Sequence, residues 1–418
     1  MIKYSKTRSF LSGFKESDAT VAKESAILPS MEKTGTDHLQ NAFFGQCHPH
    51  CPGCAHRWMR LPESLGQKEK WLKKRLSAWA DQIAPVRRPD DDHLFHYRTK
   101  VCLSAEWDAN GWQFGLVHRD RVIDLRDCPV HSPEINAAAR LLKESLPCAE
   151  AFPLVYYVQS GAQATLVVKQ KNIPDPSWLT TDLTAKLEKT GMEGLWLHLN
   201  PGAGKNVFAK NFWRLLWGTQ RSTDASGFIY GPRSFQQLIP QLFQEAMDCA
   251  EAFLSPRPKD LLVDLYCGTG IGLKRWTDRG CKVMGVERDG EAVTCAGANA
   301  PLAALLRGKC KDRIPQLDRW ASAPPLKAGR LAFVNPPRIG LEPEVIHWLA
   351  QEYRPARIAY LSCSAGTLCR DLERLESHGY ETRCIIPFDF FPWTYHVECL
   401  ALVALKNIAE YAFYSRRQ

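Results

Sequence analysis

A chain of 418 residues, 45% of them hydrophobic and 24% charged, has the length and composition of a globular protein with two or three domains. It contains no apolar run long enough to span a bilayer and no apolar signal core near Met1, so we expect neither a membrane protein nor an exported one. The net charge of +9 is compatible with a polyanionic partner. Fifteen cysteines without a secretion signal favour free thiols in a reducing, cytoplasmic compartment over a disulfide scaffold.

The first motif is Cys47-His-Pro-His-Cys51-Pro-Gly-Cys54, which follows a polar stretch over 1–46 that we interpret as a flexible extension. Prolines and a glycine keep the motif out of a helix, so the three sulfurs can converge on one point. Such thiolates bind zinc or an iron–sulfur cluster. A zinc site would also recruit a nearby histidine, namely His48, His50 or His56. The spacing also occurs in radical S-adenosylmethionine enzymes, but the Lys-rich helical stretch over 66–83 does not suit their barrel.

The next part of the chain has the pattern of a β-rich domain. Alternating polar and apolar residues over 97–105 predict a strand, and the Asn-Gly pair at 110–111 predicts a hairpin into a second strand over 111–118. Further strands are expected over 152–158, 164–169 and 194–200, with helices near 133–145 and 180–190.

From about residue 226 the pattern becomes α/β, with a helix over 240–254 and then a strand, a glycine loop and a helix over 260–272. Glycines in this loop let the backbone approach a ligand closely. The following strand ends at Glu287, whose carboxylate can accept both hydroxyls of a ribose. The form Asp-Leu-x-Cys-Gly-x-Gly is more typical of an S-adenosylmethionine loop than of a dinucleotide loop, although a dinucleotide dehydrogenase remains an alternative.

A second reactive position is Cys363, where a short apolar strand meets a Ser-Cys-Ser turn and a helical segment. Backbone N–H groups and the positive end of that helix are expected to favour a thiolate. The alternative is a buried structural cysteine.

Several segments together resemble the RNA uridine-C5 methyltransferases, which make 5-methyluridine in tRNA and ribosomal RNA. The similarity runs from about Cys47 to about Lys406 and is strongest over Ser362–Leu372, which resembles the nucleophile motif. The other matching segments are Cys47–Cys54, the basic strands over 97–120, the loop over 260–287, and the Asn335–Arg338 and His396–Glu398 motifs. Arg338 stands where an adenine-amine methyltransferase would have Tyr or Phe.

This resemblance implies an α/β fold with a class I (Rossmann-like) S-adenosylmethionine-dependent methyltransferase domain over 228–418. A central, β-rich α+β domain over 95–227 would bind RNA, and an iron–sulfur segment with a helix would occupy 47–94. By the same resemblance, Cys363 attacks uracil C6 and Glu398 removes the C5 proton. The cofactor S-adenosylmethionine would contact Gln237, Tyr266, Gly268, Gly270, Glu287, Asp312 and Asn335. A 4Fe-4S cluster would be bound by Cys47, Cys51, Cys54 and Cys128.

Several positions depart from the family pattern: Asn335 stands where Asp is usual, and Ile239 and Ile271 stand where Asn is frequent. These departures leave open an RNA-binding protein with lost or altered catalysis. Within the family, a cluster accompanies mostly ribosomal-RNA enzymes, so the resemblance implies 23S rRNA as the substrate, with tRNA as the alternative. We also expect a monomer.

Overall fold

The computed structural model describes residues 40, 43–45, 47–203, 206–210, 212–323 and 328–406. The chain divides into two compact units, the first made of Met1–Arg60 and Arg98–Gln220, and the second of Leu61–Tyr97 and Arg221–Gln418. The expected iron–sulfur segment over 47–94 is thus shared between the units. The expected extension over 1–46 lies outside the described residues, apart from 40 and 43–45. None of the described helices is long and apolar enough to cross a membrane.

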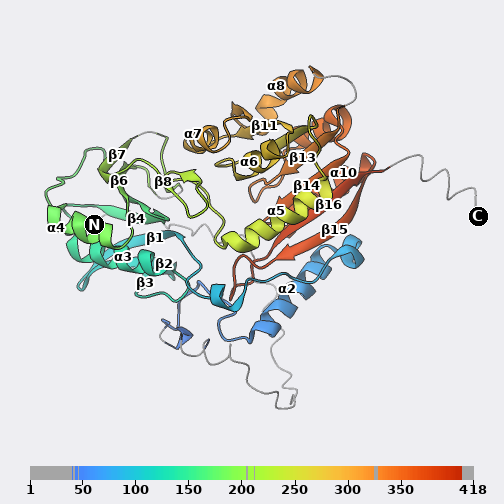
Figure 1. Cartoon of the computed structure of the whole chain (residues 1–418). Coiled ribbons are helices and arrows are strands. Elements are labelled where there is room, and N and C mark those ends of the chain that lie inside the picture. Colours follow the sequence, from blue (N-terminus) through green and yellow to red (C-terminus); the bar gives the residue numbers. More distant parts are fainter. Residues whose placement is uncertain are drawn as a thin grey trace, which may run out of the picture. The chain divides into compact units, whose positions relative to one another are not determined.

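The first unit is built on one seven-stranded sheet with the order β3-β2-β1-β4-β5-β6-β7 (Figure 1). Its elements are β1 (Lys100–Asp108), β2 (Gly111–His118), β3 (Arg121–Asp124), α3 (Pro133–Ser145), β4 (Leu154–Ser160), β5 (Gln163–Val168), α4 (Thr181–Lys189), β6 (Gly194–Leu199) and β7 (Trp213–Gly218). Only the β5–β6 pair is parallel, because α4 provides the crossover between these strands. Apolar residues of α3 and α4 pack on the buried side chains of β1, β2 and β4–β6, which forms the core of this unit.

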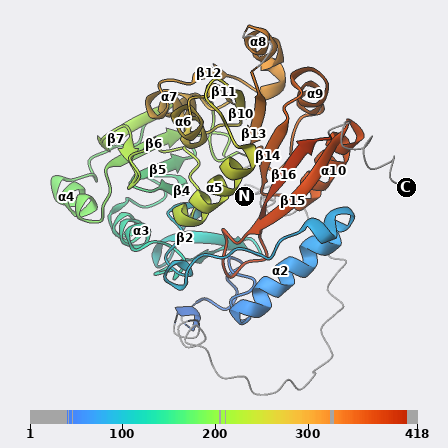
Figure 2. The same ribbon diagram turned by 45° about the vertical axis from the view of Figure 1, so that its right-hand side comes forward.

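The second unit contains a seven-stranded sheet with the order β12-β11-β10-β13-β14-β16-β15 (Figure 2). The strands are β10 (Leu261–Leu265), β11 (Lys282–Glu287), β12 (Ala304–Arg307), β13 (Arg330–Val334), β14 (Arg357–Ser362), β15 (Tyr380–Phe388) and β16 (Glu398–Leu405), besides the short pair β8 (Ser222–Thr223) and β9 (Ile229–Tyr230). Strands β10–β14 pair in parallel, whereas β16 is antiparallel to both β14 and β15. The carboxyl ends of the five parallel strands therefore share one edge, where open α/β sheets bind ligands.

Helices cover both faces of this sheet. They are α2 (Leu61–Arg75), η1 (Ser77–Gln82), η2 (Asp91–His93), α5 (Pro240–Leu254), α6 (Ile271–Asp278), α7 (Gly290–Asn299), α8 (Cys310–Ser322), α9 (Pro343–His347), the π-helical η3 (Trp348–Tyr353) and α10 (Ala365–Ser377). Met284 and Val286 of β11 face a core shared with α2, η1 and α8–α10. Between them, Gly285 faces the opposite side, where a Cβ would meet Leu273 of α6 at 2.9 Å.

The segment after α2 closes the free edge of the sheet at β15. Ile83 and Arg87 form parallel bridges with Ile385 and Phe388. These contacts satisfy backbone groups that an edge strand would otherwise expose. The helix expected over 66–83 is therefore two helices, α2 and η1, and both belong to the second unit.

Candidate active site

Cys363 and Glu398 are brought together by the pairing of β14 with β16. In this antiparallel register Ser362 is opposite Cys399, so Cys363 and Glu398 occupy the next position along the same pair of strands. Cys363 follows the end of β14 directly, and Ser364 caps α10 by accepting a hydrogen bond from the Thr367 N–H. Two residues 35 positions apart in the sequence thus become neighbours, because one ends a strand and the other begins its partner.

Glu398 is buried and Cys363 is partly buried, and the pKa values of both groups reflect this. Burial and the charge of Glu398 raise the pKa of Cys363 to about 11, although Arg338 opposes this shift by its charge and by a hydrogen bond to the thiol. Burial raises the pKa of Glu398 to about 7, opposed by a hydrogen bond from Gln237 and by the charge of Arg338. The expected thiolate is therefore not the resting form, because desolvation outweighs the helix end and the neighbouring cation.

The arrangement combines a nucleophile, a carboxyl group that titrates near neutral pH, a cation and an amide. Glu398 is only 4% exposed, and the Gln237 Nε2 donates to its Oε2 at 3.5 Å. A carboxyl group with a pKa near 7 can take up and release a proton at the pH of the cell. Gln237, which the resemblance places at the cofactor, thus also contacts the candidate base.

The loop that carries Arg338 is fixed to the helix that follows Cys363. The Thr367 hydroxyl donates to the Arg338 carbonyl at 3.1 Å. The fully buried Asp371 accepts the Leu341 N–H and the Tyr360 hydroxyl, each at 2.8 Å. Sequence reasoning assigned no role to Asp371, and its only signal was its place within the motif around Cys363.

The glycine loop after β10 has the conformation that its residues require. Gly268 and Gly270 have φ angles of +55° and +88°. A Cβ on Gly270 would lie 3.0 Å from Ala296 of α7, whereas a Cβ on Gly268 would meet nothing within 4 Å. Gly270 therefore packs the loop on a helix, while Gly268 borders open space in which a ligand could approach the backbone.

The acid at the end of β11 lies beside this loop. Oε2 of Glu287 accepts the Gly268 N–H at 3.1 Å, and its Oε1 accepts the Asp289 N–H at 2.7 Å. A second acid, Asp264, is buried within β10, and its Oδ1 has no hydrogen-bond partner in the described part of the chain. Burial raises the pKa of Asp264 to about 8. Sequence reasoning did not single out Asp264, since an acid inside an apolar strand also occurs as a structural group.

The other expected cofactor residues follow the same edge of the sheet. Tyr266 comes after β10 and donates its hydroxyl to Glu342. Asn335 comes after β13, and its N–H donates to the Leu265 carbonyl at 3.2 Å. Asp312 lies in the first turn of α8, beyond β12.

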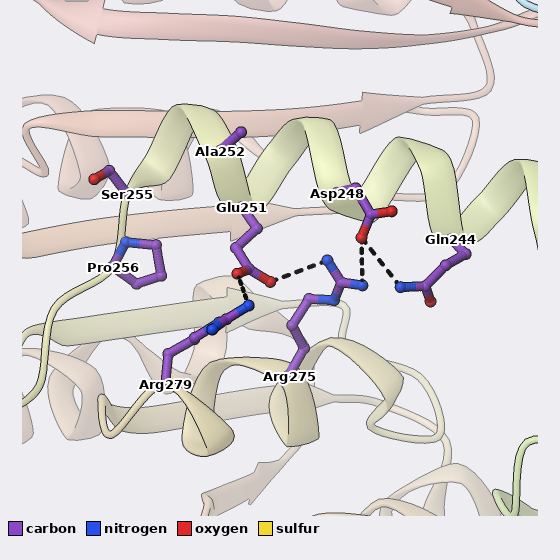
Figure 3. A pocket seen from close by; sticks show the side chains of 8 residues that line it. All are labelled: Gln244, Asp248, Glu251, Ala252, Ser255, Pro256, Arg275 and Arg279. Atoms are coloured by element: carbon purple, nitrogen blue, oxygen red, sulfur yellow. Dashed lines mark hydrogen bonds and ion pairs between the residues drawn. The ribbon is translucent and has the colours of Figure 1, made fainter.

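A separate surface depression of about 620 Å³ lies beside α5 and α6 (Figure 3). Its lining residues are Gln244, Asp248, Glu251, Ala252, Ser255, Pro256, Arg275 and Arg279. Figure 3 shows that the two arginines point toward the two acids of α5, and Arg275 pairs with Asp248 at 2.7 Å. None of the expected site residues lines this depression, and its charges neutralise one another.

The four cysteines of the expected cluster lie near one another in the first unit. Partial burial raises the pKa of Cys54 to about 12 and that of Cys128 to about 11, and charge on Cys47 or Cys51 would raise both further. The Arg57 guanidinium fixes the motif by donating to the Cys51 carbonyl at 2.9 Å and to the Cys54 carbonyl at 3.3 Å. Among the described residues, however, no group of three or more His, Cys, Asp or Glu side chains is arranged as a metal site.

Comparison with known proteins gives consistent matches. Residues 328–406 match the family model described as tRNA (Uracil-5-)-methyltransferase. An uncharacterized RNA methyltransferase of Halalkalibacterium halodurans is 26% identical over 387 residues, which cover 85% of this chain and 82% of that protein. Another, from Lactobacillus johnsonii, is 35% identical over 252 residues, which cover 57% of this chain and 52% of its own.

Among solved structures, the Pyrococcus abyssi tRNA (uracil-54, C5)-methyltransferase in complex with S-adenosyl-L-homocysteine is similar in fold. It superposes with a TM-score of 0.61 at 22% identity and covers 86% of this chain and 87% of its own. The strand order and this match define a Rossmann-like S-adenosylmethionine-dependent methyltransferase fold. The segment over 328–406 is similar to the tRNA/RNA uracil-5-methyltransferases, and the relatives that match most of the chain are named RNA methyltransferases.

Proposed function

We propose that this enzyme transfers a methyl group from S-adenosylmethionine to C5 of a specific uridine in RNA, through a covalent adduct between Cys363 and uracil C6. The observation that supports this most is the adjacency of Cys363 and Glu398 across β14 and β16, with Arg338 hydrogen-bonded to the thiol. Methylation at C5 needs a nucleophile and a base on one pyrimidine ring, and a thiol beside a carboxylate supplies both.

In the proposed reaction Cys363 releases its proton to solvent, its sulfur adds to C6, and the electrons of the C5–C6 double bond move toward the uracil carbonyl. Carbon C5 thereby becomes nucleophilic and takes the methyl group. Glu398 then accepts the C5 proton, the C6–S bond breaks, and its electron pair returns to the Cys363 sulfur. Because the pKa of the thiol is about 11, Arg338 has to stabilise the thiolate when the substrate arrives. The uridine must leave its stack, since the ring is otherwise inaccessible.

S-adenosylmethionine, when bound, supplies the electrophilic methyl group. The residues at the carboxyl edge of the sheet fit this cofactor: Gly268 borders open space, Glu287 presents a carboxylate suited to ribose hydroxyls, and one Asp264 oxygen has no hydrogen-bond partner among the described residues. We propose that Tyr266, Gly270, Asp312 and Asn335 complete the site. Asn335 carries no charge, so its contribution is a hydrogen bond alone.

We propose 23S rRNA as the substrate, because the resemblance associates cysteine-cluster members mainly with ribosomal RNA. The description of the matched family model favours tRNA as the second candidate. The fifteen cysteines are all free thiols, which supports action in the reducing cytoplasm, and we propose a monomer.

We further propose that Cys47, Cys51, Cys54 and Cys128 bind a 4Fe-4S cluster. The thiol of Cys128 accepts backbone hydrogen bonds from Val130 and His131, as cluster sulfurs commonly do. The cluster would tie the N-terminal segment to the strands of the first unit.

Labelled S-adenosylmethionine tests the reaction directly. The enzyme is incubated with unmodified 23S rRNA or with tRNA, and the RNA is digested to nucleosides. We expect the label in 5-methyluridine, at one position and chiefly in 23S rRNA. Label in methyladenosine or methylcytidine would refute the proposed chemistry, and label chiefly in tRNA would select the second substrate.

A further inference from the structure

The loop over 389–397 joins β15 to β16 and ends at Glu398, so its position determines where the candidate base stands. Its central residue Trp393 is fully buried and has a φ angle of +65°. The Trp393 Nε1 donates to the Leu94 carbonyl at 2.8 Å, and its ring stacks on Phe95 with centroids 5.5 Å apart. A non-glycine residue in this conformation persists only where its surroundings hold it.

The first residue of the loop, Asp389, forms a fully buried ion pair with Lys68 of α2. The Lys68 Nζ lies 2.5 Å from Oδ1 of Asp389, and both side chains are 0% exposed. The same ammonium group donates to the Phe391 carbonyl at 3.2 Å. One cation from α2 therefore holds two points at the start of the loop.

Backbone contacts fix the same corner of the molecule. The Asp389 N–H donates to the Arg87 carbonyl at 2.8 Å, and the Arg87 N–H donates to the Pro387 carbonyl at 2.9 Å. Just before Trp393, the Tyr97 hydroxyl donates to the Pro392 carbonyl at 3.1 Å. The segment over 61–97 thus contacts the loop at Asp389, Phe391 and Pro392 and at Trp393 itself.

The buried Lys68–Asp389 ion pair does not stabilise the loop more than apolar packing could. Burying two charges costs free energy that their attraction only partly returns, and an apolar pair often stabilises a fold equally well. The second oxygen of Asp389, Oδ2, also lacks a hydrogen-bond partner in the described part of the chain. Unlike apolar packing, the charged hydrogen bond between Nζ and the carboxylate is directional, so it fixes the position of Asp389 relative to α2.

We propose that Lys68 and Asp389 are positioning residues for Glu398, which makes α2 part of the catalytic apparatus although it is distant in sequence. This inference rests on the proposed function of Glu398. A base works only within hydrogen-bond reach of the proton it removes, so a loosened loop slows proton removal and the release of Cys363 that follows. It leaves the attack of Cys363 and the methyl transfer unchanged, because these steps precede the action of Glu398.

The experiment measures trapped adduct rather than overall activity. Wild type, Lys68→Met and Glu398→Gln are mixed with substrate RNA and methyl-labelled S-adenosylmethionine, and the labelled protein–RNA adduct is quantified on a denaturing gel beside the released product. Lys73→Met is the matched control, since Lys73 lies on the same helix but pairs with Glu69 at the surface. A double variant, Lys68→Met/Asp389→Asn, removes both charges and so avoids an unpaired buried ion.

For Lys68→Met and the double variant we expect the ratio of adduct to product to rise about tenfold over wild type, a fraction of the effect of losing a base outright. Lys73→Met should keep the wild-type ratio. The proposal is overturned if the double variant folds with a wild-type melting temperature and a wild-type ratio, or if both variants lose adduct and product in parallel. Absence of adduct in Glu398→Gln would instead refute the proposed function, so the two failures are distinguishable.

Discussion

At the scale of single residues, Glu398 combines deep burial with a carboxyl group that must be ionised to act as a base. Its pKa of about 7 lies well above the ordinary value of 4.5 because water is excluded from it. The same burial keeps Cys363 protonated. The resemblance to a known family pointed to both residues, but not to these ionisation states, because desolvation depends on packing that the local sequence does not encode.

The raised pKa of Glu398 predicts a pH-dependent gain of stability in Glu398→Gln. The folded protein binds this proton more tightly than the unfolded chain, so wild type loses stability as pH rises from about 4.5 to about 7. Glutamine carries no such penalty. At pH 8 the free energy of unfolding of the variant should exceed that of wild type by on the order of 3 kcal/mol, and near pH 4.5 the two proteins should be equally stable.

Thermal unfolding of both proteins across this pH range is the measurement. Glu352→Gln serves as the control, because Glu352 is exposed and should change stability little at any pH. A Glu398→Gln protein that is less stable than wild type at pH 8 would show that the carboxylate is held by favourable contacts rather than penalised by burial.

At the scale of elements, periodicity predicted much of the fold. The expected segments over 111–118, 133–145 and 240–254 coincide with β2, α3 and α5. Strand β7 was not predicted, because polar and apolar residues do not alternate over 213–218. The break between α2 and η1 was not predicted either, because it lies within one continuous helical pattern.

The glycine loop gives a prediction at this scale. Gly268→Ala places a methyl group in open space that the cofactor would use, whereas Gly270→Ala presses one against Ala296. Each substitution costs about 1–2 kcal/mol for a left-handed alanine. We therefore expect Gly268→Ala to lose affinity for S-adenosylmethionine with a modest decrease in melting temperature. Gly270→Ala should have a larger decrease in melting temperature.

Calorimetric titration with S-adenosylmethionine and thermal unfolding separate these effects. Equal affinities for wild type and Gly268→Ala would mean that the cofactor does not approach this loop.

At the scale of the whole molecule, the chain builds two units whose composition could not be derived from sequence order. Residues 61–97 pack with a domain that resumes at Arg221, and the Lys68–Asp389 pair joins positions 321 residues apart. Nothing in the sequence of this Lys-rich helix indicates that Lys68 pairs with Asp389. Of the four cysteines proposed as cluster ligands, three lie within eight residues of one another in the sequence, whereas the fourth, Cys128, was named only from the resemblance.

The proposed cluster predicts the metal content of the intact protein. Protein purified without oxygen should be brown and contain about four iron and four sulfide per chain. Cys128→Ser should lose most of both, whereas Cys148→Ser, which changes an exposed cysteine of the same unit, should keep them. Stoichiometric zinc without labile sulfide would contradict the cluster.

The central claim is that Cys363 bonds to uracil before methyl transfer and that Glu398 acts afterwards. The most direct measurement is mass spectrometry of the protein–RNA adduct formed by Glu398→Gln, with Cys363→Ala as its counterpart. We predict a methylated uridine attached at Cys363 in Glu398→Gln, and neither adduct nor product in Cys363→Ala. Near-wild-type product from Cys363→Ala, or an adduct attached at Cys369, would contradict the account.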